Sequence, residues 1–194
     1  MHDKVVFITG ATSGLGLSTA KHLQSLGFKV YGTGRNPRGD HSFELIKMDV
    51  RDQNSIENAI SYVLSKEKTI DILINNAGIG ITGSIEDTPT EGMREVFETN
   101  FFGAIEMMKA VLPQMRKQKK GLIINVTSIA GYMGLPFRAI YSASKGALEL
   151  VTEALRMEVK TFGIHIANVA PGDFATNIAS GRVTTEIQEE SAYA

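Results

Sequence analysis

The sequence predicts a single α/β domain in which helices cover both faces of a doubly wound parallel sheet, giving three layers. Short apolar runs alternate with helical patterns, and several runs are almost continuously apolar, as strands covered on both faces are. A glycine-rich turn separates the first run from the first helix. A length of 194 residues suits one domain.

Six apolar runs are predicted as strands, and they are separated by segments with helical periodicity. The strands are expected at residues 4–9, 29–33, 43–50, 71–77, 121–128 and 164–171. The helical patterns cover residues 15–27, 55–67, 92–118 and 141–163. Two of them end at a glycine that suits a helix C-cap, Gly27 and Gly163. Right-handed crossovers then place ligands at the carboxyl ends of the strands.

The composition excludes several classes of function. A formal net charge of -1 gives no electrostatic reason to expect nucleic acid or an acidic membrane as a partner. Cysteine is absent, which removes disulfides and thiol chemistry, and the four histidines are far apart in sequence, so no metal site is expected. No apolar stretch is long enough for a membrane span. The amino-terminal segment lacks the layout of a signal peptide, so a cytoplasmic protein is expected.

The carboxyl-terminal stretch differs from the rest of the chain because it is polar and contains no further apolar run. Residues 1–180 are expected to form the catalytic domain. Residues 181–194 are interpreted as the start of a substrate lid or as an incomplete carboxyl-terminal region, because no last strand or final helix is recognised. A disordered tail is the alternative.

The glycine-rich turn "TGATSGLG" follows the first strand and opens the first helix. Glycines allow a tight turn and a close approach of the backbone to phosphate, and the helix amino terminus offers free N–H groups and a positive dipole end. This is the layout of a Rossmann-type dinucleotide-binding domain. The predicted contacts in this turn are Gly10, Thr12, Ser13, Gly14, Leu15 and Gly16.

The end of the second strand, "YGTGRNP", indicates which dinucleotide is bound. An acidic residue there would bond the ribose 2′-OH of NAD, but Gly34 takes that place and Arg35 follows. Because a guanidinium suits a 2′-phosphate, Arg35 favours NADP, with Thr33 and Asn36 as further hydrogen-bonding contacts. The alternative is that Arg35 is only a solvated charge in a loop.

Two further strand ends supply predicted cofactor contacts. Asp49, which ends the third strand, would accept a hydrogen bond from the adenine amino group, with Val50 against the ring. In the "NNAG" motif after the fourth strand, Asn75 is interpreted as structural. The cofactor-lining residues of that motif are Asn76, Ala77 and Gly78.

The proton-transfer candidates lie at the end of the fifth strand and in the helix that follows. Ser128 ends the strand, and Tyr141 and Lys145 are four residues apart on one helical face. By itself this Tyr–Lys pair proves little, because a surface tyrosine and lysine sharing a helical face give the same pattern.

In combination, the glycine-rich turn, "NNAG", the strand-end serine and Y-x-x-x-K resemble the short-chain dehydrogenase/reductase family. The segments "SIAGYMGLPFRAIYSASKGALE" and "PGDFATN" are especially similar to its 17β-hydroxysteroid dehydrogenase type 1 and retinol dehydrogenase branch. The resemblance implies that Tyr141 is the general acid and base, Lys145 its charged neighbour and ribose ligand, and Ser128 the group that orients the carbonyl. It also implies that Asn100 helps to hold a proton-relay water. The nicotinamide contacts that it implies are Pro171, Gly172 and Thr176.

The resemblance implies an NADP(H)-dependent oxidoreductase that acts on a carbonyl or secondary alcohol, with a steroid, retinoid or other lipophilic substrate. A 3-oxoacyl thioester reductase and a catalytically silent NADP-binding regulator are the alternatives. It further implies a homodimer or homotetramer built through the helical patterns at "FFGAIEMMKAVL" and "ALELVTEALRMEV". The alternative is that the extra apolar residues of these helices only pack against the sheet.

Overall fold

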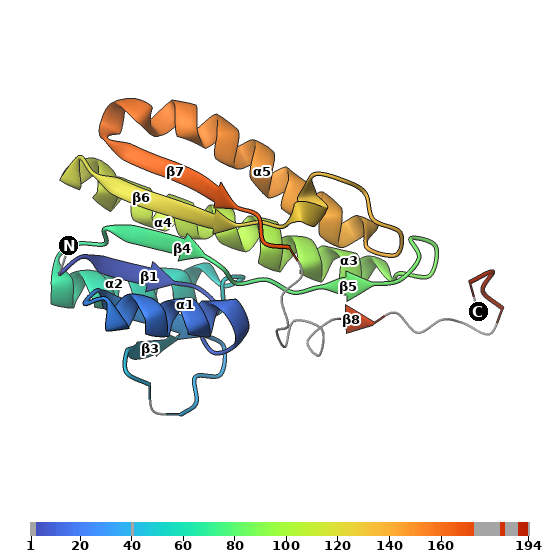
Figure 1. The fold of residues 1–194 in the computed structure, drawn as a ribbon, viewed down its shortest axis with the longest axis horizontal. Coiled ribbons are helices and arrows are strands. Elements are labelled where there is room, and N and C mark those ends of the chain that lie inside the picture. The colour runs from blue at the N-terminus through green and yellow to red at the C-terminus, as the bar shows by residue number, and fades with distance from the viewer. Residues whose placement is uncertain (1–2, 40, 173–182, 185–189, 194) are drawn as a thin grey trace.

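The computed structural model describes residues 3–39, 41–172, 183–184 and 190–193. Its centre is a six-stranded sheet in which every adjacent pair is parallel, and the arrows of β1, β4, β6 and β7 point the same way in Figure 1. In spatial order the strands are β3 (Glu44–Lys47), β2 (Lys29–Gly34), β1 (Val5–Ile8), β4 (Ile72–Asn75), β6 (Gly121–Val126) and β7 (Ile164–Val169). The six predicted strands are therefore confirmed.

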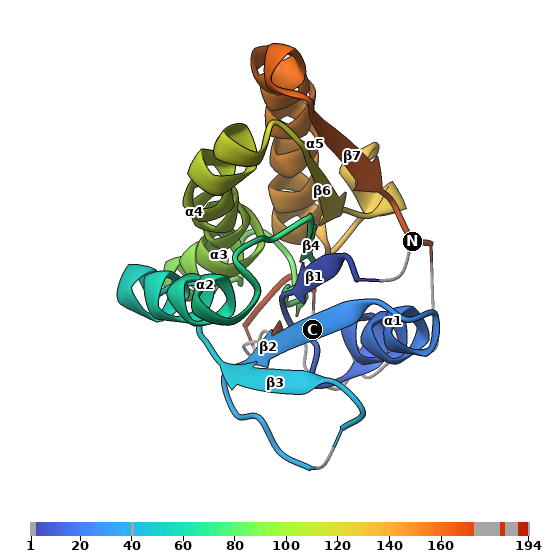
Figure 2. The same cartoon turned by 90° about the vertical axis from the view of Figure 1, so that its left-hand side faces the viewer.

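Helices cover both faces of this sheet, which confirms the predicted three-layer arrangement (Figure 2). One face carries α1 (Gly14–Ser25). The other carries α2 (Gln53–Glu67), α4 (Gly103–Gln118) and α5 (Ala139–Val159). Because the chain order reverses between β1 and β4, the carboxyl ends of these strands form the switch point at which doubly wound sheets bind ligands.

The two faces of each strand belong to two separate apolar clusters, which explains why the strand sequences are almost continuously apolar. Val5 and Phe7 of β1 pack into the larger cluster with residues of α2, α4 and α5. Val6 and Ile8 pack into the smaller cluster with Ala20 of α1. Alternate side chains of a strand point to opposite faces, so both faces of β1 are buried.

The long helical pattern at residues 92–118 is not one α-helix. It consists of α3 (Thr90–Phe97), a π-helical turn (Glu98–Phe102) and α4. The wider π turn contains Asn100, whose side chain is hydrogen-bonded to the backbone of Ile79. Few proteins contain π-helical turns, and those that occur are often found at functional sites. A π turn adds only one residue to a helical turn, and this hardly changes the spacing of apolar residues. The π turn was therefore not predicted from the sequence.

Helix ends and short strands show a second limit of the sequence pattern. Gly27 and Gly163 have φ values of 86° and 71°, as predicted for the ends of their helices. Lys68 and Lys119 end α2 and α4 in the same left-handed conformation without glycine. The two-residue strand β5 (Ile81–Thr82) pairs in parallel with β8 (Val183–Thr184), and neither was predicted.

Across the described ranges, no helix has the length and apolar character needed to cross a membrane.

Candidate active site

A cavity of about 380 Å³ lies at the carboxyl ends of the strands and is lined by segments that follow β1, β2, β3, β4, β6 and β7. It brings together most of the residues that sequence analysis singled out. Those lining it are Gly10, Thr12, Ser13, Gly14, Leu15, Arg35, Asp49, Val50, Asn76, Ala77, Gly78, Ser128, Tyr141, Lys145, Pro171 and Gly172.

The glycine-rich turn runs close to the chain after β4 and leaves no room for a side chain at Gly10 or Gly16. Gly10 and Gly14 have φ values of 68° and 54°, which other residues rarely adopt. A Cβ atom on Gly10 would lie 2.9 Å from the Cα atom of Ala77, and one on Gly16 would lie 2.3 Å from the Gly10 carbonyl oxygen. Gly16 does not line the cavity, so its place is in the packing beneath the turn.

Asn76 fixes this turn against the end of β4. Its Nδ2 atom donates to the carbonyl oxygens of Thr9 and Gly10, at 2.9 and 3.1 Å. The Thr9 hydroxyl oxygen in return accepts from the backbone N–H groups of Asn76 and Ala77, both at 3.0 Å. These four bonds hold two loops that are 67 residues apart in sequence, so the phosphate-binding turn has a preformed shape.

The cavity end near β2 offers hydrogen bonds that the described protein atoms do not use. The Thr33 hydroxyl oxygen is buried and has no partner among the described residues, and Thr33 lines the cavity. Because a buried polar atom without a partner is costly, this hydroxyl fits a polar ligand such as the adenosine part of a dinucleotide. Arg35 lines the same end and is exposed, whereas Asn36 is exposed and does not line the cavity.

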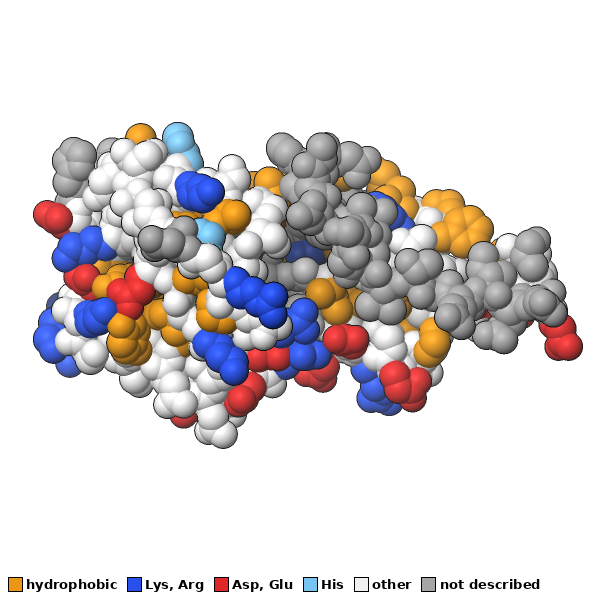
Figure 3. Space-filling model, turned by 90° about the horizontal axis from the view of Figure 1, so that it is seen from below, with side chains coloured by type: hydrophobic (Ala, Val, Ile, Leu, Met, Phe, Trp, Pro, Cys, Tyr) orange, Lys and Arg blue, Asp and Glu red, His pale blue; other side chains and the backbone are white. Residues whose placement is uncertain are grey.

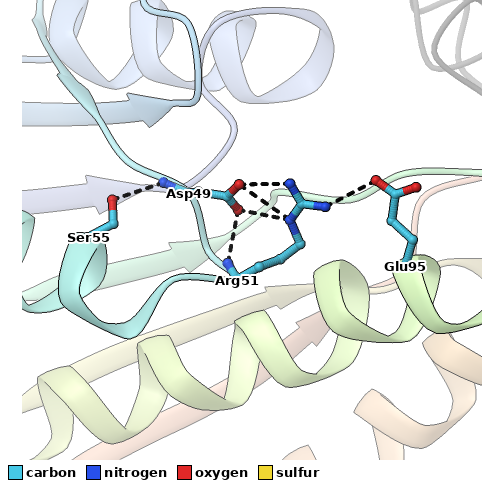
Figure 4. A network of polar contacts seen from close by, with 4 residues as sticks. All are labelled: Asp49, Arg51, Ser55 and Glu95. Carbon is cyan, nitrogen blue, oxygen red and sulfur yellow. Dashed lines mark hydrogen bonds and ion pairs between the residues drawn. The ribbon is translucent and has the colours of Figure 1, made fainter.

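Figure 3 shows how charges are distributed on the face seen from below. Lys and Arg side chains gather near its middle, at the horizontal position where β1 and β4 end in Figure 1, and Asp and Glu side chains lie beside them. A group of paired charges joins the end of β3 to α3 (Figure 4). Arg51 pairs with Asp49 at 2.8 Å through Nη2, and with Glu95 at 3.1 Å through Nη1.

The pairing with Arg51 stabilises the ionised form of the Asp49 carboxyl. Hydrogen bonds from the Arg51 side chain hold the pKa of the Asp49 carboxyl below its ordinary value. The backbone N–H of Arg51 adds a bond of 3.0 Å to the same carboxylate. An adenine amino group at Asp49 would therefore share this carboxylate with Arg51. Sequence analysis missed Arg51, although its place two residues after a strand-end aspartate was a signal.

Lys145 is a buried cation beside the predicted acid. Its side chain in α5 is 4% exposed, and its Nζ atom donates to the Val126 carbonyl oxygen at 2.8 Å. The same Nζ atom lies 6.0 Å from the centre of the Tyr141 ring. Burial lowers the pKa of Lys145 to about 8. The i and i+4 spacing thus brings the pair together, as the sequence predicts.

Ser128 lies at the end of β6 in a position that leaves its hydroxyl proton free to be donated. It precedes a short 3₁₀ helix (Ile129–Gly131), and its Oγ atom accepts a hydrogen bond of 3.2 Å from the Ala130 N–H. A hydroxyl that accepts from one group still has its own O–H to donate. A substrate carbonyl oxygen is the acceptor that this geometry suits.

Asn100 does not line the cavity and lies behind the loop that does. It is 1% exposed; its Oδ1 atom accepts from the Ile79 N–H at 2.8 Å, and its Nδ2 atom donates to the Ile79 carbonyl and the Ser144 hydroxyl. A Cβ atom on Gly78 would lie 3.2 Å from Asn100 Oδ1 and 3.5 Å from Lys145 Nζ. Asn100 therefore fixes the backbone next to Lys145. Its role in holding a water stays a prediction.

Two more differences from the sequence expectation concern residues around the site. Thr176 lies outside the described residues. Sequence analysis also missed Arg138, which lines the cavity three residues before Tyr141. Arg138 is the N-cap of α5 and lies outside its helical turns, so the helix-face rule that linked Tyr141 to Lys145 did not indicate it.

Comparisons with known proteins agree with this geometry. Residues 4–187 match the model of the short chain dehydrogenase family. A 3-ketodihydrosphingosine reductase of Bacteroides thetaiotaomicron is 43% identical over 188 residues, covering 96% of this chain and 70% of the relative. A short-chain dehydrogenase structure from Streptomyces avermitilis superposes with a TM-score of 0.91 at 33% identity, covering 100% of this chain and 75% of that one. A 3-ketoacyl-(acyl-carrier-protein) reductase from Brucella melitensis, complexed with NADH, gives 0.88 at 28% identity, covering 92% and 79%.

Proposed function

The chain belongs to the short-chain dehydrogenase/reductase family of oxidoreductases, and from this premise we propose that it transfers hydride between NADP(H) and a carbonyl or secondary alcohol. The observation that carries the proposal is the arrangement of Ser128, Tyr141 and Lys145 in one cavity with the glycine-rich turn. Residues 1–180 form the catalytic domain in this proposal.

Each side chain has a separate task in carbonyl reduction. When bound, the nicotinamide supplies the hydride that reduces the carbonyl carbon. Ser128 donates a hydrogen bond to the carbonyl oxygen and orients it. Tyr141 gives its phenol proton to that oxygen, and the Lys145 ammonium beside the ring stabilises the phenolate that remains. In the oxidation direction Tyr141 accepts the proton from the alcohol.

Arg35 supports NADP over NAD. It lines the cavity at the end of β2, where a guanidinium suits a 2′-phosphate, and no acidic residue takes the place that would bond a 2′-OH. The buried hydroxyl of Thr33 lies one strand position before Gly34 and offers a further hydrogen bond to the adenosine part. The cofactor contacts that were predicted around Pro171, Gly172 and Thr176 remain part of this proposal.

The proposed substrate is a lipophilic compound whose reacting ketone is at carbon 3 of an acyl chain. Two of the similar proteins are named as reductases of 3-keto compounds, one a 3-ketodihydrosphingosine and one a 3-ketoacyl group. In this chain, four large apolar side chains between Ser128 and Tyr141 are exposed, which gives an alkyl chain a surface to contact. They are Ile129, Tyr132, Met133 and Phe137.

We also propose that two copies associate through α4 and α5. Leu150 and Met157 of α5 are 69% and 73% exposed, and a spacing of seven residues puts them on one helical face. Phe102, the last residue of the π turn before α4, is exposed as well. Analytical ultracentrifugation should give a dimer or tetramer for the wild type and a smaller species for Met157→Glu. A monomeric wild type would contradict the proposal.

The function is tested by following NADPH oxidation with a panel of ketones. The panel should include ethyl 3-oxooctanoate, a steroid ketone and all-trans-retinal, with the substrate-free rate as the baseline. We expect the highest kcat/KM for the 3-oxo ester. Tight NADPH binding without turnover of any carbonyl would instead support a catalytically silent NADP-binding regulator.

A further inference from the structure

Some of the charged side chains that line the cavity already have protein partners, and others do not. Arg51 is paired with Asp49 and Glu95, and Lys145 is bonded to a backbone carbonyl. Arg35 lies at the β2 end, where the proposed 2′-phosphate binds. The remaining charged residue in the lining is a single arginine, Arg138, which belongs to the half of the cavity that contains the reacting groups.

Arg138 lies one helical turn before the predicted acid. It is the N-cap residue of α5, and its carbonyl oxygen accepts the first hydrogen bond of the helix, from the Ser142 N–H at 2.9 Å. Arg138 and Tyr141 are three residues apart, and both line the cavity. A substrate whose ketone oxygen lies at Tyr141 therefore has its neighbouring atoms within reach of the Arg138 guanidinium.

No acidic group of the cavity neutralises Arg138. Asp49, the acidic residue of the lining, follows β3, whereas Tyr141 lies beyond β6. The strand order puts four strand spacings between β3 and β6, which is roughly 19 Å. Among the described residues, the Arg138 guanidinium makes no hydrogen bond or ion pair. Its five donors are thus available to a ligand.

We propose that Arg138 binds a second oxygen atom of the substrate, the carboxylate or ester carbonyl at carbon 1 of a 3-oxoacyl compound. The inference rests on the proposed function and narrows its substrate class. A guanidinium binds a carboxylate with two parallel hydrogen bonds and an ester carbonyl with one.

The test compares three ketones that share an eight-carbon chain with the reacting carbonyl at carbon 3: 3-oxooctanoate, ethyl 3-oxooctanoate and 3-octanone. In the wild type, kcat/KM should fall in that order. In Arg138→Met, kcat/KM for 3-oxooctanoate relative to 3-octanone should fall about 10- to 100-fold, mainly through KM, as expected for lost hydrogen bonds to a charged group. Arg138→Lys should recover part of this loss. Arg94→Met, which removes an exposed arginine of α3 outside the cavity, is the control.

Two outcomes separate this inference from the proposed function. If the wild type reduces these ketones but Arg138→Met changes all three equally, the role of Arg138 is overturned and the proposed function stands. If the wild type reduces none of them, the proposed function fails, and calorimetric titration of the NADPH-loaded protein with 3-oxooctanoate decides the inference. Binding that Arg138→Met weakens at least tenfold would support the site; binding unaffected by the substitution, or no binding, would overturn it.

Discussion

The Nζ atom of Lys145 lies 6.0 Å from the centre of the Tyr141 ring and is anchored to the Val126 carbonyl oxygen at 2.8 Å. The anchor comes from β6 and the two side chains come from α5, so sheet and helix together fix the distance between charge and phenol. An ammonium held in this way favours the phenolate form of a neighbouring tyrosine. The proton chemistry of the site depends on this relationship.

Burial of Lys145 should make the stability of the protein depend on pH. The folded protein releases the Lys145 proton above about pH 8, because burial lowers its pKa from 10.5, whereas the unfolded chain keeps it until about pH 10.5. Between these values the unfolded state binds more protons, so stability rises with pH. Relative to Lys145→Met, the wild type should gain about 3 kcal/mol from pH 7.5 to pH 10.5.

Urea denaturation at several pH values measures this gain. Lys160→Met removes an exposed lysine near the end of the same helix and serves as the control. Parallel pH profiles of the wild type and Lys145→Met would show that Lys145 is not a buried cation in solution.

Arg35 should determine cofactor preference. Arg35→Asp removes the guanidinium and adds a charge that repels a 2′-phosphate, so the Kd for NADPH should rise about 10- to 100-fold. The Kd for NADH should change less than about threefold, since it has no 2′-phosphate. Fluorescence titration measures both. Arg38→Asp makes the same charge change three residues further along the loop, and equal losses in both variants would remove Arg35 from the site.

Asn100 should act on activity through the backbone of Ile79. Asn100→Ala leaves the N–H and carbonyl of Ile79 without their side-chain partners, which should lower the free energy of unfolding by about 1–3 kcal/mol. The Kd for NADPH should rise, because Gly78 and Ile79 line the cavity. Asn54→Ala, an exposed asparagine of α2, is the control. Unchanged NADPH binding in a destabilised Asn100→Ala variant would limit Asn100 to a purely structural role.

The fold was predictable because each buried strand is a run of apolar residues with a helical pattern after it. The elements that were not predicted from the sequence do not produce a repeating apolar pattern. The π turn at Asn100 changes the helix by one residue, and the pairing of Ile81–Thr82 with Val183–Thr184 involves too few residues to form a pattern.

The site was predictable where it follows from the topology. Strand ends in a parallel sheet meet at one edge, so Asp49 and Ser128 were expected to line the same cavity. The contact of Arg51 with Glu95 could not be predicted, because the two residues are 44 positions apart in sequence. Arg138 was missed because it lies in an irregular segment before α5, where no periodic pattern indicates which way a side chain points.

The most direct test of the account is the rate of NADPH-dependent reduction of ethyl 3-oxooctanoate by Tyr141→Phe. Removing the phenol hydroxyl takes away the proton donor and keeps the ring, so kcat should fall about 10²- to 10⁴-fold while the Kd for NADPH changes less than about threefold. A Tyr141→Phe variant that retains a kcat within threefold of the wild type would contradict the assignment of Tyr141 as the general acid.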